Sequence, residues 1–479
     1  MSLLICGFHA EWHGKIINGI VKELGEPKTV IISSYCHELL SEHKVTRYDF
    51  QDFAYCEYHS IDFQSLLPID ITLIEALSRC QNNYLQMLER LQIKRGHKIG
   101  YQDRIRYFYN DLRIMNDILE KHNIDVCVID WIPHLGFDYV LYELCKYKKI
   151  KVVMQFVATA IPYKTVSRYF LNDIFDPIPK LADICWDNPV SEIQLSERMQ
   201  SYLDYYSGNK EKIKAVFTIN EFKKKEPKVI KYLKSTIRML GERNRKLLPA
   251  IKLRTEEFFR LKRIKKFINT HYKKGDSGEK YFYFPLHYQP ECTTMPMASY
   301  YVDQKLVIDM VTALLPDDVK LYIKPHPNPS VLADVKFYKQ LAENKKVCIL
   351  PSEISSYDLI DNAEGIVTLT GTVAWESLVR KKPVMMFGYY YYQYAPGVFH
   401  VKATSDCKEA IQSILNKEYS IDEVQLKRFL QEFERYLVDG YMDDEYETIY
   451  KMDREINIQN AVKGYINYIR DDANWTDNV

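Results

Sequence analysis

Short apolar runs alternate with long amphipathic stretches along most of this 479-residue chain, and this alternation restricts the fold more than any other feature. In the first half the apolar runs lie at 3–6, 29–32, 126–129 and 152–156, with a further one at 216–219. The connections are too long for hairpins, and several repeat apolar residues at helical spacing. Strands joined by helices pair in parallel. The first half therefore predicts a doubly wound α/β domain.

The second half repeats this pattern, with runs at 281–284, 319–323, 347–350, 366–369 and 384–387. Residues 300–315 predict a helix that ends before Pro316, because proline cannot continue a helix. Two α/β units of similar size predict two facing doubly wound domains with a cleft between them. Ligands of such sheets bind beyond the carboxyl ends of the strands, so polar residues that directly follow a run are the site candidates.

The charges balance overall but not locally. Lys and Arg number 65 against 64 Asp and Glu, a net charge of +1, which argues against a dedicated nucleic-acid binder. Residues 221–280, however, hold about 20 basic and about 7 acidic residues, and the last sixty hold about 14 acidic and about 7 basic ones. We predict an N-terminal domain at 1–220, a basic helical linker at 221–278, a C-terminal domain at 279–440, and a helical segment at 441–479 that packs back on the N-terminal domain.

The basic segment has two interpretations. Apolar residues recur there at helical spacing among Lys and Arg, which usually indicates a solvated helix packed on the protein, but which also suits a helix on an anionic membrane surface. No apolar run is long enough to span a membrane, no basic leader opens the chain, and the ten cysteines form no C-x-x-C pair. We expect a cytoplasmic protein, with attachment to the inner face of the cytoplasmic membrane as the second interpretation.

The most informative stretch is Lys324-Pro325-His326-Pro327, which directly follows a predicted strand. Proline fixes φ, so the flanking prolines present the imidazole in one orientation. A fixed His beside a Lys suits a phosphate or diphosphate through charge-assisted hydrogen bonds. The alternative is a turn whose histidine is merely exposed.

Thr370-Gly371-Thr372 joins another predicted strand to a helix that carries Glu376. Hydroxyls, a glycine and the amides of a helix N-terminus favour an anion, and Glu376 is a candidate for binding a ribose. Capping by Thr370 or Thr372 without a ligand is the alternative. Together with the His326 turn, this element predicts two edges of one nucleotide-phosphate site.

Gln289 and Glu291 follow the first strand of the second half. Gln289 is a candidate for binding a sugar hydroxyl or the donor. Glu291 is a candidate acid, base or electrostatic stabiliser, although a carboxylate at a strand end is often only a helix cap.

The first half offers a second group of candidates. Asp130, His134 and Asp138 follow the strand at 126–129, and His9 and His13 follow the first strand. His134 or Asp130 could deprotonate an acceptor hydroxyl, Asp138 could orient or cap, and His9 and His13 could line an acceptor cleft. The spacing around His9 and His13 is not that of the H-E-x-x-H zinc helix, which disfavours a metalloprotease.

Several signatures are absent from the sequence. It contains no G-x-G-x-x-G, no G-x-x-x-x-G-K-[ST] and no G-x-S-x-G, which disfavours a Rossmann dehydrogenase, a P-loop kinase and an α/β-hydrolase. It also lacks the D-x-D triplet with which many nucleotide-sugar enzymes hold a divalent metal. We therefore expect no metal and no other cofactor, and no nucleic-acid partner.

The second half resembles the capsule polysaccharide biosynthesis family of bacterial glycosyltransferases. In chain order the matching residues are Phe284-Pro285-Leu286-His287, Gln289-Pro290-Glu291, Lys324-Pro325-His326-Pro327, Ser355-Ser356-Tyr357-Asp358, Thr370-Gly371-Thr372 with Trp375-Glu376, and Lys382-Pro383-Val384. Their order and spacing cover residues 281–388. The element at 133–138 also resembles the N-terminal half of such proteins, though more weakly.

The resemblance implies a GT-B fold of two Rossmann-like domains, with the donor bound mainly by the C-terminal one. The His-Pro motif is similar to that of Kdo transferases and bacterial sialyltransferases, which use CMP-activated acidic sugars, so His326 and Pro327 are expected at the nucleotide phosphate. Thr370 and Thr372 resemble the second phosphate-binding motif of those enzymes. Around Gln289 and Glu291 the chain departs from the Kdo-transferase pattern, which leaves the catalytic acid, the donor and the stereochemistry open.

The implied activity is metal-independent transfer of a sugar from a nucleotide donor, CMP-Kdo by preference, to a saccharide or lipid-linked saccharide of a bacterial capsule. A CDP-alditol phosphotransferase of teichoic-acid type and a non-catalytic scaffold of capsule assembly are the alternatives. A nucleotide-sugar epimerase is a weaker one.

Overall fold

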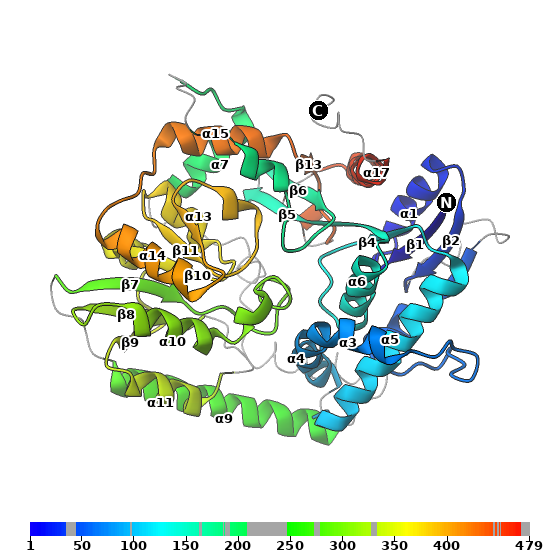
Figure 1. The fold of residues 1–479 in the computed structure, drawn as a ribbon, viewed down its shortest axis with the longest axis horizontal. Coiled ribbons are helices and arrows are strands. Elements are labelled where there is room, and N and C mark those ends of the chain that lie inside the picture. Colours follow the sequence, from blue (N-terminus) through cyan, green and yellow to red (C-terminus); the bar gives the residue numbers. More distant parts are fainter. Residues whose placement is uncertain are drawn as a thin grey trace. The chain divides into compact units, whose positions relative to one another are not determined.

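The computed structural model divides the chain into two compact units (Figure 1). Unit 1 comprises Met1–Leu91, Ile99–Lys180 and Gln431–Val479, and unit 2 comprises Gln92–Lys98 and Leu181–Leu430. The structure describes the whole chain except residues 35–44, 96–97, 162–164, 185, 187–191, 208–246, 273–277, 327–332, 444–445, 448–449, 451 and 471–479.

Unit 1 is built on a seven-stranded sheet of order β13-β6-β5-β4-β1-β2-β3. Its strands are β1 (Ser2–Cys6), β2 (Lys28–Ile32), β3 (Val45–Tyr48), β4 (Val126–Ile129), β5 (Lys151–Ile161), β6 (Thr165–Leu171) and β13 (Leu437–Asp439). The strands from β5 to β3 pair in parallel, whereas β6 pairs antiparallel with both β5 and β13. The central strands β1 and β4 are almost completely buried, as their continuous apolar runs predict.

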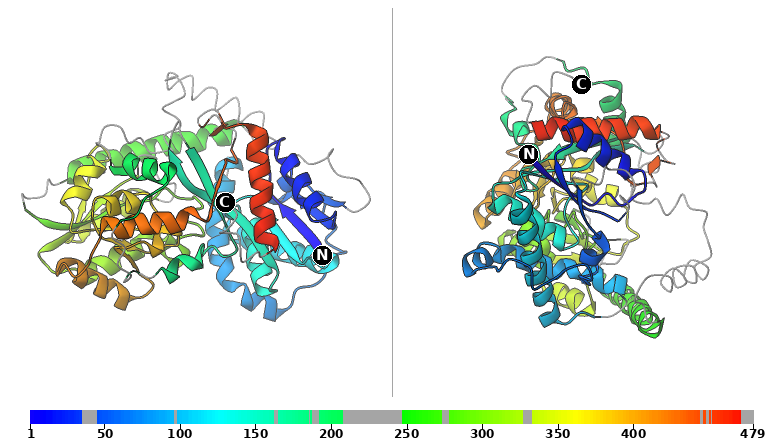
Figure 2. Two further views of the ribbon diagram at one scale, coloured as in Figure 1. Left: turned by 90° about the horizontal axis from the view of Figure 1, so that it is seen from above. Right: turned by 90° about the vertical axis from the view of Figure 1, so that its right-hand side faces the viewer.

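The helices of unit 1 connect these strands and cover the sheet. They are α1 (His13–Glu23), α2 (Phe50–Ala54), α3 (Ile71–Ala76), α4 (Ser78–Arg95, whose last residues fall in unit 2), α5 (Tyr101–His122), α6 (Phe137–Tyr147) and α17 (Arg454–Arg470). Helix α17, the last described helix, lies against α1, so segments far apart in the sequence pack together in this unit (Figure 2). The contact is close because Gly19 has no side chain: a Cβ there would lie 2.6 Å from Cγ2 of Val462.

Unit 2 contains a six-stranded, fully parallel sheet of order β12-β11-β10-β7-β8-β9. Its strands are β7 (Lys280–Pro285), β8 (Val319–Lys324), β9 (Val347–Ile349), β10 (Gly365–Thr368), β11 (Val384–Met386) and β12 (Val398–His400). The chain builds outward from β7 to β9 on one side and then from β10 to β12 on the other. The strand order therefore reverses between β7 and β10, as in a doubly wound fold.

Helices surround the sheet of unit 2 and complete its core. They are α7 (Glu197–Ser207), α9 (Leu247–His271), α10 (Gln304–Leu314), α11 (Val335–Glu343), α12 (Ser356–Asn362), α13 (Val373–Val379), α14 (Thr404–Leu415) and α15 (Glu423–Glu434, which continues into unit 1). Helix α10 packs against α14, α11 against α9, and α13 against α7. Strand residues such as Phe282, Ile323 and Val367 are completely buried between these helices.

The sequence prediction of an α/β chain with two Rossmann-like sheets, as a GT-B fold requires, is confirmed. The sequence predicts a domain boundary at residue 220, which lies outside the described residues, whereas the chain changes units near Leu181. The reason is the packing of α7: the ring of Tyr202 stacks on Trp375 of α13, and its hydroxyl lies 2.9 Å from the hydroxyl of Tyr391. At the other end, the chain rejoins unit 1 from Gln431 onward, where β13 pairs with β6.

The helix predicted at 300–315 is shorter than expected. Helix α10 begins at Gln304, because the Asp303 carboxylate accepts the Lys305 amide as an N-cap, and a 3-10 turn (Ser299–Val302) precedes it. The strand predicted at 216–219 and the basic residues 221–246 lie outside the described residues. Within the described part of the chain every cysteine is a free thiol, and no helix is both long and apolar enough to cross a bilayer.

Candidate functional site

The reversal of strand order in unit 2 brings together several of the predicted donor residues. The carboxyl ends of β7, β10 and β8 are adjacent, and the segments that leave them carry His287, Thr368 with Thr370, and Lys324 with His326. In open α/β sheets this reversal point is where ligands bind. The sheet topology alone therefore selects this edge as the candidate site of unit 2.

His287 bridges the reversal point. Its Nε2 lies 3.1 Å from the hydroxyl oxygen of Thr368 and accepts the Leu369 amide at 3.1 Å. A nitrogen that accepts an amide hydrogen carries no proton, so the ring is neutral with its proton on Nδ1. Burial, with a smaller contribution from His326, lowers the pKa of His287 to about 3. His287 was not among the site residues predicted from the sequence, although it follows β7 just as His326 follows β8.

Lys324 is a fixed cation at the end of β8. Its side chain is buried, and its Nζ donates to the Ile354 carbonyl at 2.6 Å and to the Ser356 hydroxyl at 2.8 Å. Burial lowers the pKa of Lys324, and the nearby Glu376 carboxylate opposes this shift. The ammonium group is thus held in one place by two neutral acceptors.

Glu376 lies on α13 in the same region. Burial raises its pKa to about 7, while a 3.4 Å hydrogen bond from Thr372 and the charges of Arg380 and Lys324 oppose the rise. Arg380 itself pairs with Asp361 at 3.2 Å. Glu376 therefore changes its charge near neutral pH, which is a property common at functional sites.

The Thr370-Gly371-Thr372 turn is held by bonds within the protein. The hydroxyl of Thr370 donates to the Thr293 carbonyl at 2.5 Å, and the Gly371 amide donates to Thr368 at 3.1 Å. The Tyr392 hydroxyl donates to the Gly371 carbonyl at 2.6 Å. Of the two threonines, Thr370 is buried and Thr372 is exposed, so Thr372 is the one whose hydroxyl a ligand can reach.

Gln289 and Glu291 occupy a turn after β7. The Gln289 side chain is buried, donates to the Val302 carbonyl, and accepts from the Gln304 amide at 2.9 Å. It therefore holds the turn together rather than facing a ligand. Glu291 is partly buried and accepts the Thr293 hydroxyl at 3.1 Å. His326 is partly exposed, with its ring 5.9 Å from that of Tyr288, whereas Pro327 lies outside the described residues.

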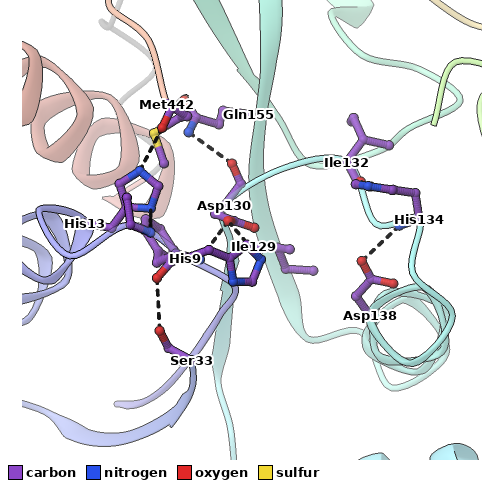
Figure 3. Close-up of polar contacts among 12 residues, drawn as sticks. His9, His13, Ser33, Ile129, Asp130, Ile132, His134, Asp138, Gln155 and Met442 are labelled. Atoms are coloured by element: carbon purple, nitrogen blue, oxygen red, sulfur yellow. Dashed lines mark hydrogen bonds and ion pairs between the residues drawn. The ribbon is translucent and has the colours of Figure 1, made fainter. Parts of the chain in front are cut away.

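The N-terminal candidates separate into two groups, which Figure 3 shows. In the first group, Asp130 follows β4 and His9 follows β1, again where the strand order reverses. The Asp130 carboxylate accepts the Phe8 amide at 2.7 Å, and one oxygen lies 3.9 Å from His9 Nε2. The His9 side chain is 45% exposed. An accessible imidazole next to a carboxylate can take up a proton from a bound hydroxyl.

His13 is close to this group but is fully engaged. Its Nδ1 lies 3.1 Å from the Ala10 amide, its Nε2 lies 2.9 Å from the Met442 carbonyl, and its side chain is buried. Because the amide must donate to Nδ1 and the carbonyl must accept from Nε2, the ring is neutral and oriented. His13 thus ties α1 to the C-terminal segment of unit 1.

The second group in Figure 3 contains His134 and Asp138 at the start of α6. The Asp138 carboxylate, in the first turn of α6, accepts the amides of His134, Leu135 and Tyr139 at 2.8–2.9 Å, so it fixes the loop that enters the helix. Burial raises the pKa of Asp138 to about 6 despite these bonds. The imidazole of His134 is oriented by its Nδ1, which lies 2.6 Å from the Ile132 carbonyl.

The end of β4 is supported by the C-terminal segment of unit 1. Gln155 donates to the Asp130 carbonyl at 3.0 Å and accepts from the buried Arg168 at 3.1 Å. Arg168 also donates to the Asn457 side chain at 2.9 Å, and the Tyr465 hydroxyl donates to the carbonyl of Ile129 at 3.1 Å. No sequence signal identifies these partners, because Asn457 lies 289 residues from Arg168 and Tyr465 lies 336 residues from Ile129 along the chain.

Comparison with known proteins adds a family match to unit 2. Residues 296–412 match the family described as capsule polysaccharide biosynthesis protein. This match confirms the resemblance predicted from the sequence, over a range that contains Lys324, His326, Thr372 and Glu376. A search of curated proteins returns no match. Across the described residues, no three His, Cys, Asp or Glu side chains are grouped as a metal ion would require.

Solved structures with a similar fold are distant. The UDP-GlcNAc 2-epimerase of Methanocaldococcus jannaschii is 13% identical over 91% of this chain and 99% of its own, with a TM-score of 0.27. The KpsC β-Kdo 2,7 transferase of Thermosulfurimonas dismutans is 12% identical over 82% of this chain and 97% of its own, with a TM-score of 0.30. Likenesses of this size assign neither a ligand nor an activity.

Proposed function

We propose that the protein is a glycosyltransferase that adds a sugar from a nucleotide-activated donor to a bacterial capsule or surface polysaccharide. One observation carries the proposal: within the range that matches the capsule family, Lys324, His326 and Thr372 lie at the carboxyl edge of a doubly wound sheet, next to its reversal point. That is the expected place for a nucleotide phosphate.

In this proposal unit 2 holds the donor and stabilises the leaving nucleotide. The acceptor oxygen forms a bond to the anomeric carbon, and the bond from that carbon to the phosphate oxygen breaks, leaving its electron pair on the nucleotide. Lys324 is already fixed by Ile354 and Ser356, so its charge needs little reorganisation as negative charge grows on the phosphate. His326 and Thr372 supply further donors. The donor is a CMP-sugar, and the transfer needs no metal.

Unit 1 takes the saccharide or lipid-linked acceptor. We assign His9 as the base that removes the proton of the acceptor hydroxyl, because it is accessible and its Nε2 lies 3.9 Å from a carboxylate oxygen. Asp130, whose side chain is 15% exposed, stabilises the imidazolium that forms, as a carboxylate does beside a catalytic histidine. Asp138 and His13, whose polar atoms are engaged by the entry loop of α6 and by the C-terminal segment, are assigned no step.

The test is a transfer assay with a panel of CMP-, CDP- and UDP-activated substrates labelled separately in the transferred group and in the phosphorus. We expect label from the sugar, and none from the phosphorus, in the polysaccharide product. His9→Gln should lower kcat strongly with little change in donor affinity, because His9 belongs to the acceptor step. Phosphorus in the product would instead identify a phosphotransferase, and isomerised donor without product an epimerase; either result would refute the proposal.

A further inference from the structure

Helix α9 (Leu247–His271) of unit 2 has two faces with different surroundings. On one face Ile264 and Ile268 are buried in the core of unit 2, and Phe267 packs against the same core. Arg260 donates to the Ala333 carbonyl at the start of α11, and α11 lies beside α9 (Figure 1). The first interpretation of the basic segment, a helix packed on the protein, therefore holds for this face.

The opposite face of α9 is aromatic and cationic. Phe258 is 61% exposed and Phe259 is 51% exposed, and their ring centroids are 5.6 Å apart. At about 100° per residue, Lys262, Lys266 and Arg263 fall within the same arc of about 140° that contains both rings. All three cations are exposed. We call this set of five residues the outward face.

Among the described side chains of α9, the acidic one is Glu256, which falls at the margin of the arc that contains the outward face. Lys265, at the other margin, pairs with Glu353 at 2.7 Å. The outward face thus combines a positive charge with two large apolar rings in water.

We propose that the outward face lies on the surface of an anionic lipid bilayer. The phenylalanine rings enter the boundary between head groups and acyl chains, and the three cations contact lipid phosphates, which is how interfacial amphipathic helices bind. A bilayer is favoured over a protein partner because the described charges of this face, those of Lys262, Arg263 and Lys266, have one sign and accompany two exposed aromatic rings on the same side of the helix. The proposal goes beyond the transfer reaction and does not depend on it.

The test is sedimentation of the full chain with vesicles of phosphatidylcholine alone or with one quarter phosphatidylglycerol, over a range of salt concentrations. We expect binding to the anionic vesicles that falls as salt rises. Lys262→Gln with Lys266→Gln should weaken it about 25-fold, since each cation near an anionic surface contributes about fivefold. The matched control replaces two exposed lysines of α11, Lys336→Gln with Lys339→Gln, and should change it little.

The contribution of the two phenylalanine rings is tested with a second variant and its own control. Phe258→Ser with Phe259→Ser should weaken binding roughly tenfold or more, because both rings lose their burial in the bilayer. Leu306→Ser, on a residue of α10 that is also 51% exposed, should not. These positions are exposed, so the variants should keep the thermal transition of the parent.

Three results would overturn the proposal. They are no binding to anionic vesicles, equal binding by the phenylalanine variant and its Leu306→Ser control, or binding that does not respond to salt. Self-association that the phenylalanine variant abolishes, without vesicle binding, would show that this face is a protein interface instead.

Discussion

Gly7 provides a sharp test of the geometry at the end of β1. Its φ is +97°, and a Cβ built there would lie 2.0 Å from Oδ1 and 2.3 Å from Cγ of Asp130. Gly7→Ala must therefore push the Asp130 carboxylate away from the Phe8 amide that it accepts at 2.7 Å. Gly25 is the matched control, since its φ is +76° but a Cβ there would have no neighbour within 4 Å.

Alanine at Gly7 and alanine at Gly25 should lower the free energy of local opening by different amounts. At both sites an alanine costs about 1–2 kcal/mol for its left-handed backbone. At Gly7 the displaced carboxylate adds about 1.5–3 kcal/mol for the charged hydrogen bond. We therefore expect Gly7→Ala to lower the free energy of opening by about 4 kcal/mol, and Gly25→Ala by about 1–2 kcal/mol.

A double-mutant cycle isolates the clash. In an Asp130→Ala background the carboxylate atoms that meet the new methyl group are gone, so Gly7→Ala should cost only as much as Gly25→Ala. The coupling between Gly7 and Asp130 should then be about 2 kcal/mol or more.

Hydrogen exchange by mass spectrometry, read on peptides that cover β1 and β4, gives the opening free energy of this region alone. That restriction matters because a chain with two units need not unfold in one step. If Gly7→Ala costs the same in both backgrounds, or no more than Gly25→Ala, the close approach of Gly7 and Asp130 is wrong.

Two further predictions concern unit 2. Because the pKa of Glu376 is raised to about 7 from an ordinary value of 4.5, the folded state binds a proton that the unfolded chain releases earlier. The unfolding free energy should therefore fall as pH rises from about 4.5 to about 7, by at most about 1.4 kcal/mol per pH unit. In urea titrations at several pH values, Glu376→Gln should flatten this pH dependence. An unchanged slope in the variant would contradict the assignment of the effect to Glu376. Tyr202→Phe removes the hydroxyl 2.9 Å from that of Tyr391 but keeps the stack on Trp375. It should cost about 1 kcal/mol in urea unfolding, whereas a loss several times larger would mean that the hydroxyl pair does more than this contact indicates.

The sequence was sufficient to predict the buried parallel strands, because strands such as β1, β4 and β8 are continuous apolar runs that follow helix-length connections. It missed β3 and β6, whose alternating or polar residues give no such run. It also missed the three-residue strands β12 and β13, which are too short to stand out, and the partner of β13, β6, lies far away in the sequence. These strands depend on tertiary pairing more than on their own composition.

The same limit applies to the site. The sequence predicted that Lys324, His326 and Thr372 lie at one edge of the sheet, because the carboxyl ends of parallel strands share an edge, and the structure places them at that edge. It could not separate His9 from His13, since the Met442 carbonyl that engages His13 is 429 residues away. Nor could it show that Gln289 is bound by Gln304 within its own turn.

The central claim is that the carboxyl edge of the unit 2 sheet binds a nucleotide phosphate, and β8 supplies its own control. Lys324 and Lys320 lie on this strand, Lys324 at the carboxyl end and Lys320 near the amino end, where it contacts the Lys345 carbonyl at 3.1 Å. The measurement is calorimetric titration of the parent, Lys324→Met and Lys320→Met with CMP, CDP and UDP. We predict that the parent binds CMP, that Lys324→Met weakens binding at least tenfold through loss of a charged contact, and that Lys320→Met binds like the parent. Equal affinity in all three proteins, or no binding of any nucleotide by the parent, would contradict the claim.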